Sequence, residues 1–144
     1  MTDNISLAKS LFNETWDLID KPDRTDEDNI TMLHKAHTSC FLWREANNPV
    51  NNARGEWQVS RVYSLLGMGE PALLHGRYSL SLCLDNGIHG LDLAFGYEAV
   101  ARACHTLGNT ESAAANKALG LAACAQILEQ DDREYALASF ADIE

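Results

Sequence analysis

The stretch RVYSLLGMGEPALLHGRYSLSL, residues 61–82, predicts two helices joined by a tight turn. Apolar residues recur at helical spacing on both sides of its central segment, LGMGEP. Gly67 and Gly69 favour the end of a helix because glycine readily takes a left-handed backbone, and Pro71 suits the first turn of the next helix. The stretch is therefore either half of a catalytic pocket or one unit of a repeating scaffold.

The same pattern returns 41 residues later, where Leu107 and Gly108 correspond to Leu66 and Gly67. The offset also aligns Val59 with Val100, Arg61 with Arg102, and Leu80 with Leu121. It aligns small residues at three points, which are Ser60 with Ala101, Ala72 with Ala113, and Ser79 with Gly120. Small side chains let paired helices approach closely, so we expect Ala72 and Ala113 to be buried where helices cross.

The segments VSRVYSLLGMGEPALLHGRYSL (59–80) and VARACHTLGNTESAAANKALGL (100–121) resemble the tetratricopeptide repeat family. That family pairs antiparallel helices around small residues, with a Leu-Gly turn and a tyrosine that Tyr63 matches and Cys104 replaces. The resemblance covers about residues 53–129 and implies a right-handed stack of helix pairs. The chain departs from the family in lacking a closing proline and in its long offset, since the usual repeat has about 34 residues.

The chain as a whole resembles a set of small, uncharacterised bacterial proteins, and this likeness implies no function. The segments that carry it are FNETWDLIDKPDRT, LHKAHTSCFLW and ARGEWQVSRVYSLLG.

Helical spacing of apolar residues, with no convincing period-two alternation, predicts an all-α protein that forms one domain, residues 1–144. We expect about seven helices, covering residues 4–19, 26–46, 53–66, 71–84, 91–107, 111–129 and 132–142. Two repeats alone would expose apolar ends, so the first two helices and the short last helix are expected to cap the stack. Phe41 and Trp43 are expected in the core.

Composition narrows the class of partner. The net charge of −10 disfavours nucleic acid and anionic membranes, because both are bound through dense Lys and Arg. No apolar run approaches the roughly 18–20 residues of a membrane span, and the start MTDNIS lacks the regions of a signal peptide, so we expect a cytoplasmic protein. The four cysteines are widely spaced, which predicts buried free thiols rather than a zinc or redox site.

A candidate binding face follows from the family resemblance, because the first helix of each repeat lines a concave groove in that family. The implied groove residues are Arg54, Trp57, Arg61, Ser64 and Leu65 from one unit, and Phe95, Glu98, Arg102, His105 and Thr106 from the next. Helical spacing independently places positions 54, 57, 61 and 65 on one face. Guanidinium groups bind carboxylates bidentately, and indole is a rigid apolar surface, so an acidic peptide segment, a carboxylate or an anionic small molecule is the expected ligand.

Two alternatives remain open. The stripe is also explained by internal packing, with Glu98 paired to Arg102 and Arg61 stacked on Trp57. His34 and His37, spaced i, i+3, could instead serve a metal-dependent or small-molecule enzyme, with a third metal ligand from Glu14, Asp17 or His75.

The sequence shows no catalytic motif in a suitable context. The leading hypothesis is therefore a non-enzymatic scaffold without a cofactor, which binds a protein or peptide and could form a homodimer.

Overall fold

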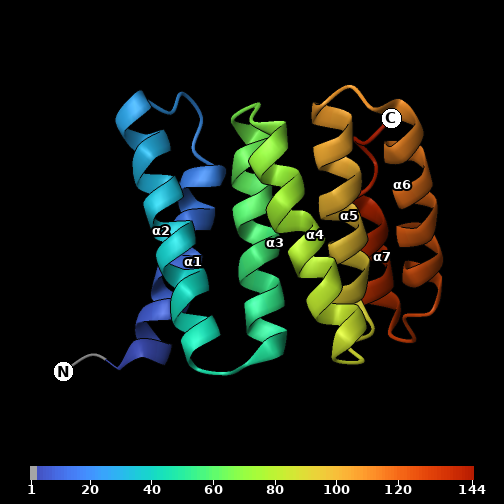
Figure 1. Ribbon diagram of the computed structural model, residues 1–144, viewed down its shortest axis with the longest axis horizontal. Helices are drawn as coiled ribbons and strands as arrows, with labels where there is room; N and C mark the ends of the chain where they lie inside the picture. Colours follow the sequence, from blue (N-terminus) through green and yellow to red (C-terminus); the bar gives the residue numbers. More distant parts are fainter. Residues whose placement is uncertain (1–2) are drawn as a thin grey trace.

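The computed structural model describes residues 3–144, and this part of the chain folds into seven α-helices with no β-strand (Figure 1). The helices are α1 (Asn4–Ile19), α2 (Asp26–Glu45), α3 (Pro49–Leu65), α4 (Gly69–Asp85), α5 (Leu91–Thr106), α6 (Thr110–Ala125) and α7 (Gln130–Ala138). Consecutive helices pack against each other, so the predicted all-α stack of helix pairs is confirmed.

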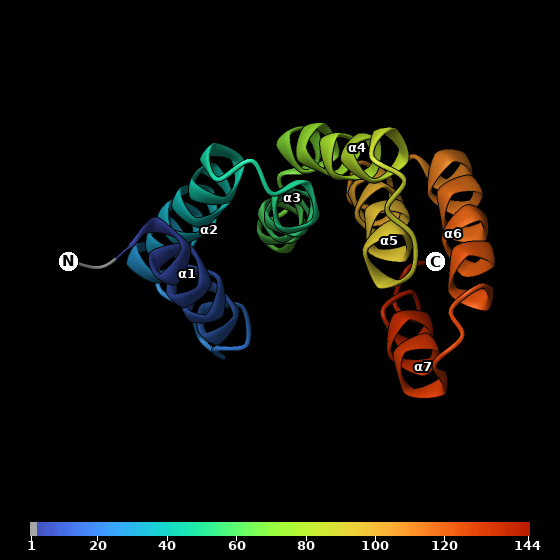
Figure 2. The same cartoon turned by 90° about the horizontal axis from the view of Figure 1, so that it is seen from below.

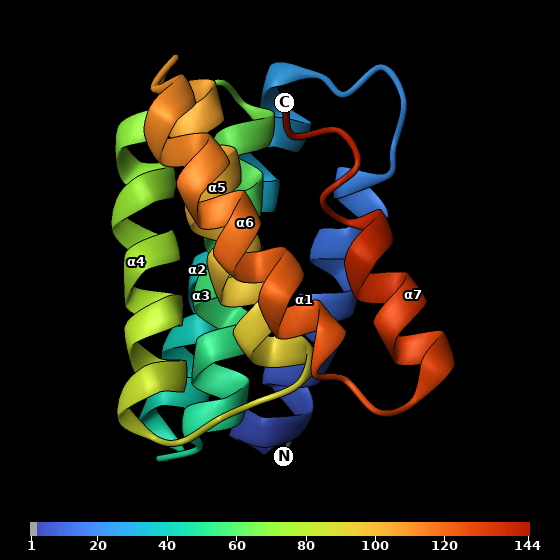
Figure 3. The same ribbon diagram turned by 90° about the vertical axis from the view of Figure 1, so that its right-hand side faces the viewer.

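The helices form an arc with an inner and an outer layer. Contacts join α1 to α3, α3 to α5, and α5 to α7, and these four helices face the inside of the arc (Figure 2). Helices α2, α4 and α6 form the outer layer, and α4 and α7 lie on opposite sides of the molecule (Figure 3). The first helix of each predicted repeat therefore lies on the inner, concave side.

The two repeat turns have the same backbone geometry. Gly67 and Gly108 have φ angles of 76° and 78°, in the left-handed region that glycine adopts without strain. After each glycine the backbone N–H bonds back into the preceding helix, from Met68 to the Tyr63 carbonyl at 2.8 Å and from Asn109 to the Cys104 carbonyl at 2.9 Å. This confirms that the 41-residue offset relates two equivalent helix ends.

Small residues lie where the paired helices cross. Ala72 and Ala113 are fully buried, as predicted from the repeat alignment. In the first pair the hydroxyl of Ser60 donates to the Ala72 carbonyl at 2.7 Å, and the hydroxyl of Ser79 donates to the Ala53 carbonyl at 2.8 Å. These bonds hold α3 and α4 together in both directions, and the small side chains permit the close approach that the bonds need.

The first two helices and the segment around α7 cover the two ends of the repeat region through buried polar and apolar contacts. The amide of Gln58 in α3 donates to the Phe12 carbonyl of α1 at 2.9 Å, and the hydroxyl of Ser39 in α2 donates to the Ala8 carbonyl of α1 at 2.7 Å. At the other end Phe140 and Ile143, which follow α7, are buried in a cluster with residues of α5 and α6. Both ends of the repeat region are thus covered.

The structure corrects the boundaries of three helices. α3 begins at Pro49, not at residue 53, because Asn48 caps it and accepts a bond from the Asn51 N–H, while proline occupies the first turn. α6 ends at Ala125, not at 129, because the side chain of Glu129 already caps α7. α7 in turn runs from 130 to 138, not from 132 to 142, and the following residues form turns that bury Phe140 and Ile143.

The predictions about the cysteines, the core aromatic residues and membrane spans have different outcomes. Cys40, Cys83, Cys104 and Cys124 are all buried free thiols, as expected. Trp43 is buried, but the prediction that Phe41 belongs to the core is wrong, since 57% of its surface is exposed on α2. None of the helices within residues 3–144 combines the length and apolar character that crossing a bilayer requires.

Candidate functional site

The inner helices surround an open groove, and aromatic side chains from all four of these helices line it together with charged and small residues. Its two adjoining hollows have volumes of about 390 and 320 Å³, and four aromatic residues line both of them. We call this feature the aromatic groove, and its aromatic residues are Phe12 and Trp16 of α1, Trp57 of α3, Phe95 of α5 and Tyr135 of α7. Each inner helix therefore contributes at least one ring.

The rings of the aromatic groove pack on one another. Trp57 and Phe95 are stacked with centroids 4.8 Å apart, and Trp16 approaches Trp57 at 5.4 Å. Tyr135 meets Phe95 edge-on at 5.8 Å and remains 64% exposed. Such pairs fix ring orientation, so the groove has a rigid buried floor of Trp57 and Phe95 with a more exposed rim.

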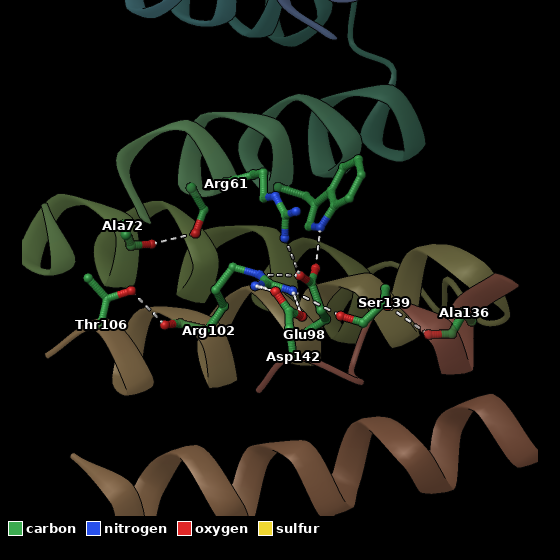
Figure 4. Close-up of polar contacts among 10 residues, drawn as sticks. Arg61, Ala72, Glu98, Arg102, Thr106, Ala136, Ser139 and Asp142 are labelled. Atoms are coloured by element: carbon green, nitrogen blue, oxygen red, sulfur yellow. Dashed lines mark hydrogen bonds and ion pairs between the residues drawn. The ribbon is translucent and has the colours of Figure 1, made fainter. Parts of the chain in front are cut away.

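Glu98 is the central polar residue at one end of this floor. Its side chain is 1% exposed, and its carboxylate accepts bonds from Trp57 Nε1 at 2.6 Å and from Arg102 Nε at 2.7 Å (Figure 4). The Arg61 guanidinium lies 3.5 Å from the same carboxylate. A buried carboxylate requires such partners, so Glu98 organises Trp57 and both arginines around itself.

Arg102 is the most heavily bonded cation of the site. Besides Glu98, it donates to both carboxylate oxygens of Asp142, at 2.8 and 2.9 Å, and to the Ser139 carbonyl at 2.9 Å (Figure 4). Burial by itself lowers the pKa of Arg102, but the bonds that it donates to Asp142 and Glu98 raise the pKa overall. The bond from Arg102 likewise lowers the pKa of Asp142. Arg102 thus ties α5 to the segment after α7.

Arg61 has far fewer partners. Its 3.5 Å approach to Glu98 is its only ion pair within residues 3–144, and its guanidinium makes no hydrogen bond there. Burial, and then the positive charge of Arg102, lower the pKa of Arg61. This cation has unused N–H donors and a repulsive neighbour, so an added anion would stabilise it.

A third hollow, of about 290 Å³, opens beside these arginines, and we call it the arginine pocket. Its lining residues are Arg61, Ser64, Leu65, Arg102, His105, Thr106 and Asp142. It shares Arg61, Arg102 and Asp142 with the aromatic groove, so the two hollows adjoin. The hydroxyl oxygen of Ser64 is buried and has no hydrogen-bond partner among the residues described.

Arg54 lies at the opposite end of the aromatic groove. Its guanidinium donates to both oxygens of Asp92, at 2.8 and 3.0 Å, and this pairing raises its pKa. Arg54 is therefore already satisfied by a carboxylate of α5, in the bidentate geometry that arginine favours.

The structure brings the sequence-predicted candidates to the inner face, but not into one cluster. Trp57, Arg61, Glu98 and Arg102 meet at Glu98, His105 is exposed at the arginine pocket, and Arg54 lies at the far end. The Glu98–Arg102 pair proposed as internal packing is present.

Sequence reasoning missed several residues that line the groove, among them Phe12, Trp16, Tyr135 and Asp142. The i, i+4 spacing of Phe12 and Trp16 marks one helix face, but the same spacing is typical of ordinary core residues. No local signal points to Asp142, because its contact with Arg102 spans 40 residues.

The two histidines of the enzyme hypothesis have different environments. His34 is exposed, whereas His37 is half-buried, with its Nε2 2.8 Å from the Tyr63 hydroxyl and its ring 5.3 Å from that of His75. Burial, followed by the nearby His75, lowers the pKa of His37. Residues 3–144 hold no group of three or more His, Cys, Asp or Glu side chains placed to bind a metal ion.

Comparison with known proteins adds no relative. No protein-family model, no curated protein and no solved structure matches the chain.

Proposed function

We propose that this chain is a cytoplasmic, tetratricopeptide-repeat-like scaffold that binds a protein or peptide segment in the aromatic groove. An acidic side chain or carboxylate of the partner would lie in the arginine pocket. One observation carries the proposal: aromatic rings from four helices meet in an open groove that adjoins an under-bonded arginine.

The aromatic groove suits an apolar anchor of the partner. Trp and Tyr offer large contact areas with little conformational freedom to lose, and they dominate the energetics of many protein interfaces. Trp57 and Phe95 are held by stacking, so the surface that a partner meets is already ordered. A preformed surface reduces the entropy cost of binding.

The arginine pocket suits an anion, and Arg61 is the residue that would recognise it. From the sequence alone, Arg54, Arg61 and Arg102 are equivalent candidates. In the structure, however, Arg54 already donates to Asp92, and Arg102 already donates to Asp142. Arg61 retains free donors, and a charge-assisted bond contributes about 1.5–3 kcal/mol. We therefore assign the anion specificity chiefly to Arg61.

The test is selection of binding peptides from a random displayed library, followed by affinity measurement on variants. Selected peptides are expected to combine an apolar or aromatic residue with an acidic one. Arg61→Gln and Tyr135→Ser should each weaken binding about tenfold or more, which corresponds to about 1.4 kcal/mol. Both side chains keep some exposure, so the thermal midpoints should change little.

Matched controls lie on the outer layer, where α4 carries exposed Arg77 and Tyr78. Arg77→Gln and Tyr78→Ser make the same chemical changes outside the groove, so affinity should be retained. Loss of affinity in the controls but not in the groove variants would reject this face as the binding site.

A further inference from the structure

The arginine pocket already contains a carboxylate from the chain itself. Both oxygens of Asp142 accept bonds from Arg102, at 2.8 and 2.9 Å, in the bidentate form that a ligand carboxylate would use (Figure 4). Asp142 also borders the aromatic groove and the arginine pocket, which share Arg61 and Arg102. A ligand anion that reached both arginines would meet this carboxylate first.

Asp142 has a fixed backbone and an exposed side chain. Phe140 and Ile143 on either side of it are fully buried, so the segment stays in place. The Asp142 side chain is 66% exposed, in contrast to Asp92, whose side chain is 13% exposed where it holds Arg54. Rotation about the side-chain bonds would release Arg102 without unfolding the segment, because solvent can take over the freed carboxylate.

We propose that Asp142 is an internal competitor that occupies the place of the ligand's anionic group on Arg102. This inference rests on the proposed function of the site, because it concerns how strongly that site binds an anion. A ligand that displaces Asp142 from Arg102 breaks the Asp142–Arg102 ion pair. A ligand with a single carboxylate therefore only replaces this ion pair with another one of the same kind. A group with three or more anionic oxygens, such as a phosphate, can replace Asp142 on Arg102 with two of them and reach the unused donors of Arg61 with another, and is therefore the favoured ligand class.

The experiment titrates the protein with inorganic phosphate at neutral pH and follows the arginine Nε–Hε signals by NMR. The wild-type chain is compared with Asp142→Asn and with Asp142→Ser. Removal of the competitor should tighten phosphate binding about two- to fivefold, which lies within the range expected for an exposed ion pair. The Arg61 and Arg102 signals should shift, and the Arg54 signal should not.

Glu14→Gln is the matched control. It removes one negative charge and one ion pair, that between Glu14 and Lys35, away from the groove. Its phosphate affinity should equal that of the wild type. If Glu14→Gln tightened phosphate binding as much as the Asp142 variants do, the proposal would be overturned, because the effect would then reflect net charge alone.

The remaining outcomes are also decisive. Unchanged phosphate affinity in both Asp142 variants, with the fold intact by thermal unfolding, would overturn the proposal, as would no phosphate binding in any variant. Tighter phosphate binding in an Asp142 variant, without any selected peptide, would uphold the competitor and reject peptide binding. Peptide binding that depends on Arg61 but is unaffected by Asp142→Asn would reject only the competitor.

Discussion

Trp57 and Glu98 are bonded to one another through the indole Nε1–H and a carboxylate oxygen, at 2.6 Å, and they are separated by 41 residues. That separation equals the offset between the two repeats, so equivalent positions of two successive inner helices are in direct contact. The bond lies at the junction of the aromatic groove and the arginine pocket, and it couples the packing of α3 on α5 to the position of Glu98.

Trp57→Phe should destabilise the fold, because it leaves one oxygen of buried Glu98 without its donor. An unsatisfied buried group costs about 1–3 kcal/mol, and the lost ring area adds to this. Trp43→Phe is the control, since Trp43 is also buried and its indole makes no hydrogen bond within the described chain. Urea unfolding should show the larger loss for Trp57→Phe, and equal losses would mean that the bond contributes nothing.

Ala72→Leu and Ala113→Leu should each destabilise the protein by about 1–3 kcal/mol, because both sites are fully buried at helix crossings. Ala122→Leu on the exposed face of α6 is the control and should have little effect, since alanine and leucine have similar helix propensities. Thermal unfolding measures all three. Unchanged midpoints for both buried variants would contradict the repeat alignment.

Arg102→Gln should cost about 3 kcal/mol, because it removes a partner of buried Glu98 and the link to Asp142 and Ser139. Arg54→Gln removes an equally bidentate but more exposed pair, and should cost less than about 1 kcal/mol. Chemical unfolding of the two variants compares them directly. A smaller loss in Arg102→Gln than in Arg54→Gln would show that Glu98 does not depend on Arg102.

Stability should fall as the pH drops below the ordinary histidine value, because the pKa of His37 is lowered in the folded protein from 6.5 by burial and by His75. At pH values between the lowered and the ordinary pKa, the unfolded chain binds more protons than the folded chain, so acid favours unfolding in this range. Above this range His37 is neutral in both states, and its full contribution to stability is present. One such group gives a slope of at most about 1.4 kcal/mol per pH unit.

His37→Gln should therefore reduce the stability difference between about pH 7.5 and about pH 5.5, whereas His34→Gln, on the exposed part of the same helix, should retain it. Urea unfolding at the two pH values provides the comparison. An identical pH dependence in wild type and His37→Gln would assign the effect to other groups.

The four thiols should react slowly with dithiodipyridine in the native protein and rapidly after denaturation, because all are buried. Burial raises the pKa of Cys83 to about 11, and burial together with Glu56 raises that of Cys40 further, so the reactive thiolate is scarce at neutral pH. Absorbance during the reaction measures the rates. Fast labelling of the native protein would contradict the burial of these residues.

Several features of the fold were predictable because their signals are local. A glycine that follows a helical pattern predicts a left-handed residue at the end of the helix. Gly67 and Gly108 are two such glycines, and both have the expected backbone conformation. The start of α3 was predicted too late, because Pro49 was interpreted as a break although proline is also favoured in the first helical turn. Phe41 was misplaced because periodicity gives the face of a residue but not what covers that face.

The sequence alone determined the helices, their turns, the repeat offset and the inner face that carries Trp57, Arg61 and Arg102, because each depends on spacing within one or two helices. Tertiary structure decided which of these side chains are free. Arg54 and Arg102 have carboxylate partners 38 and 40 residues away, and Tyr135 reaches Phe95 from another helix. Such contacts form when the arc brings α1, α3, α5 and α7 together, and no local sequence pattern predicts them. For this reason only the folded chain shows that Arg61, unlike the other two arginines, has unpaired donors.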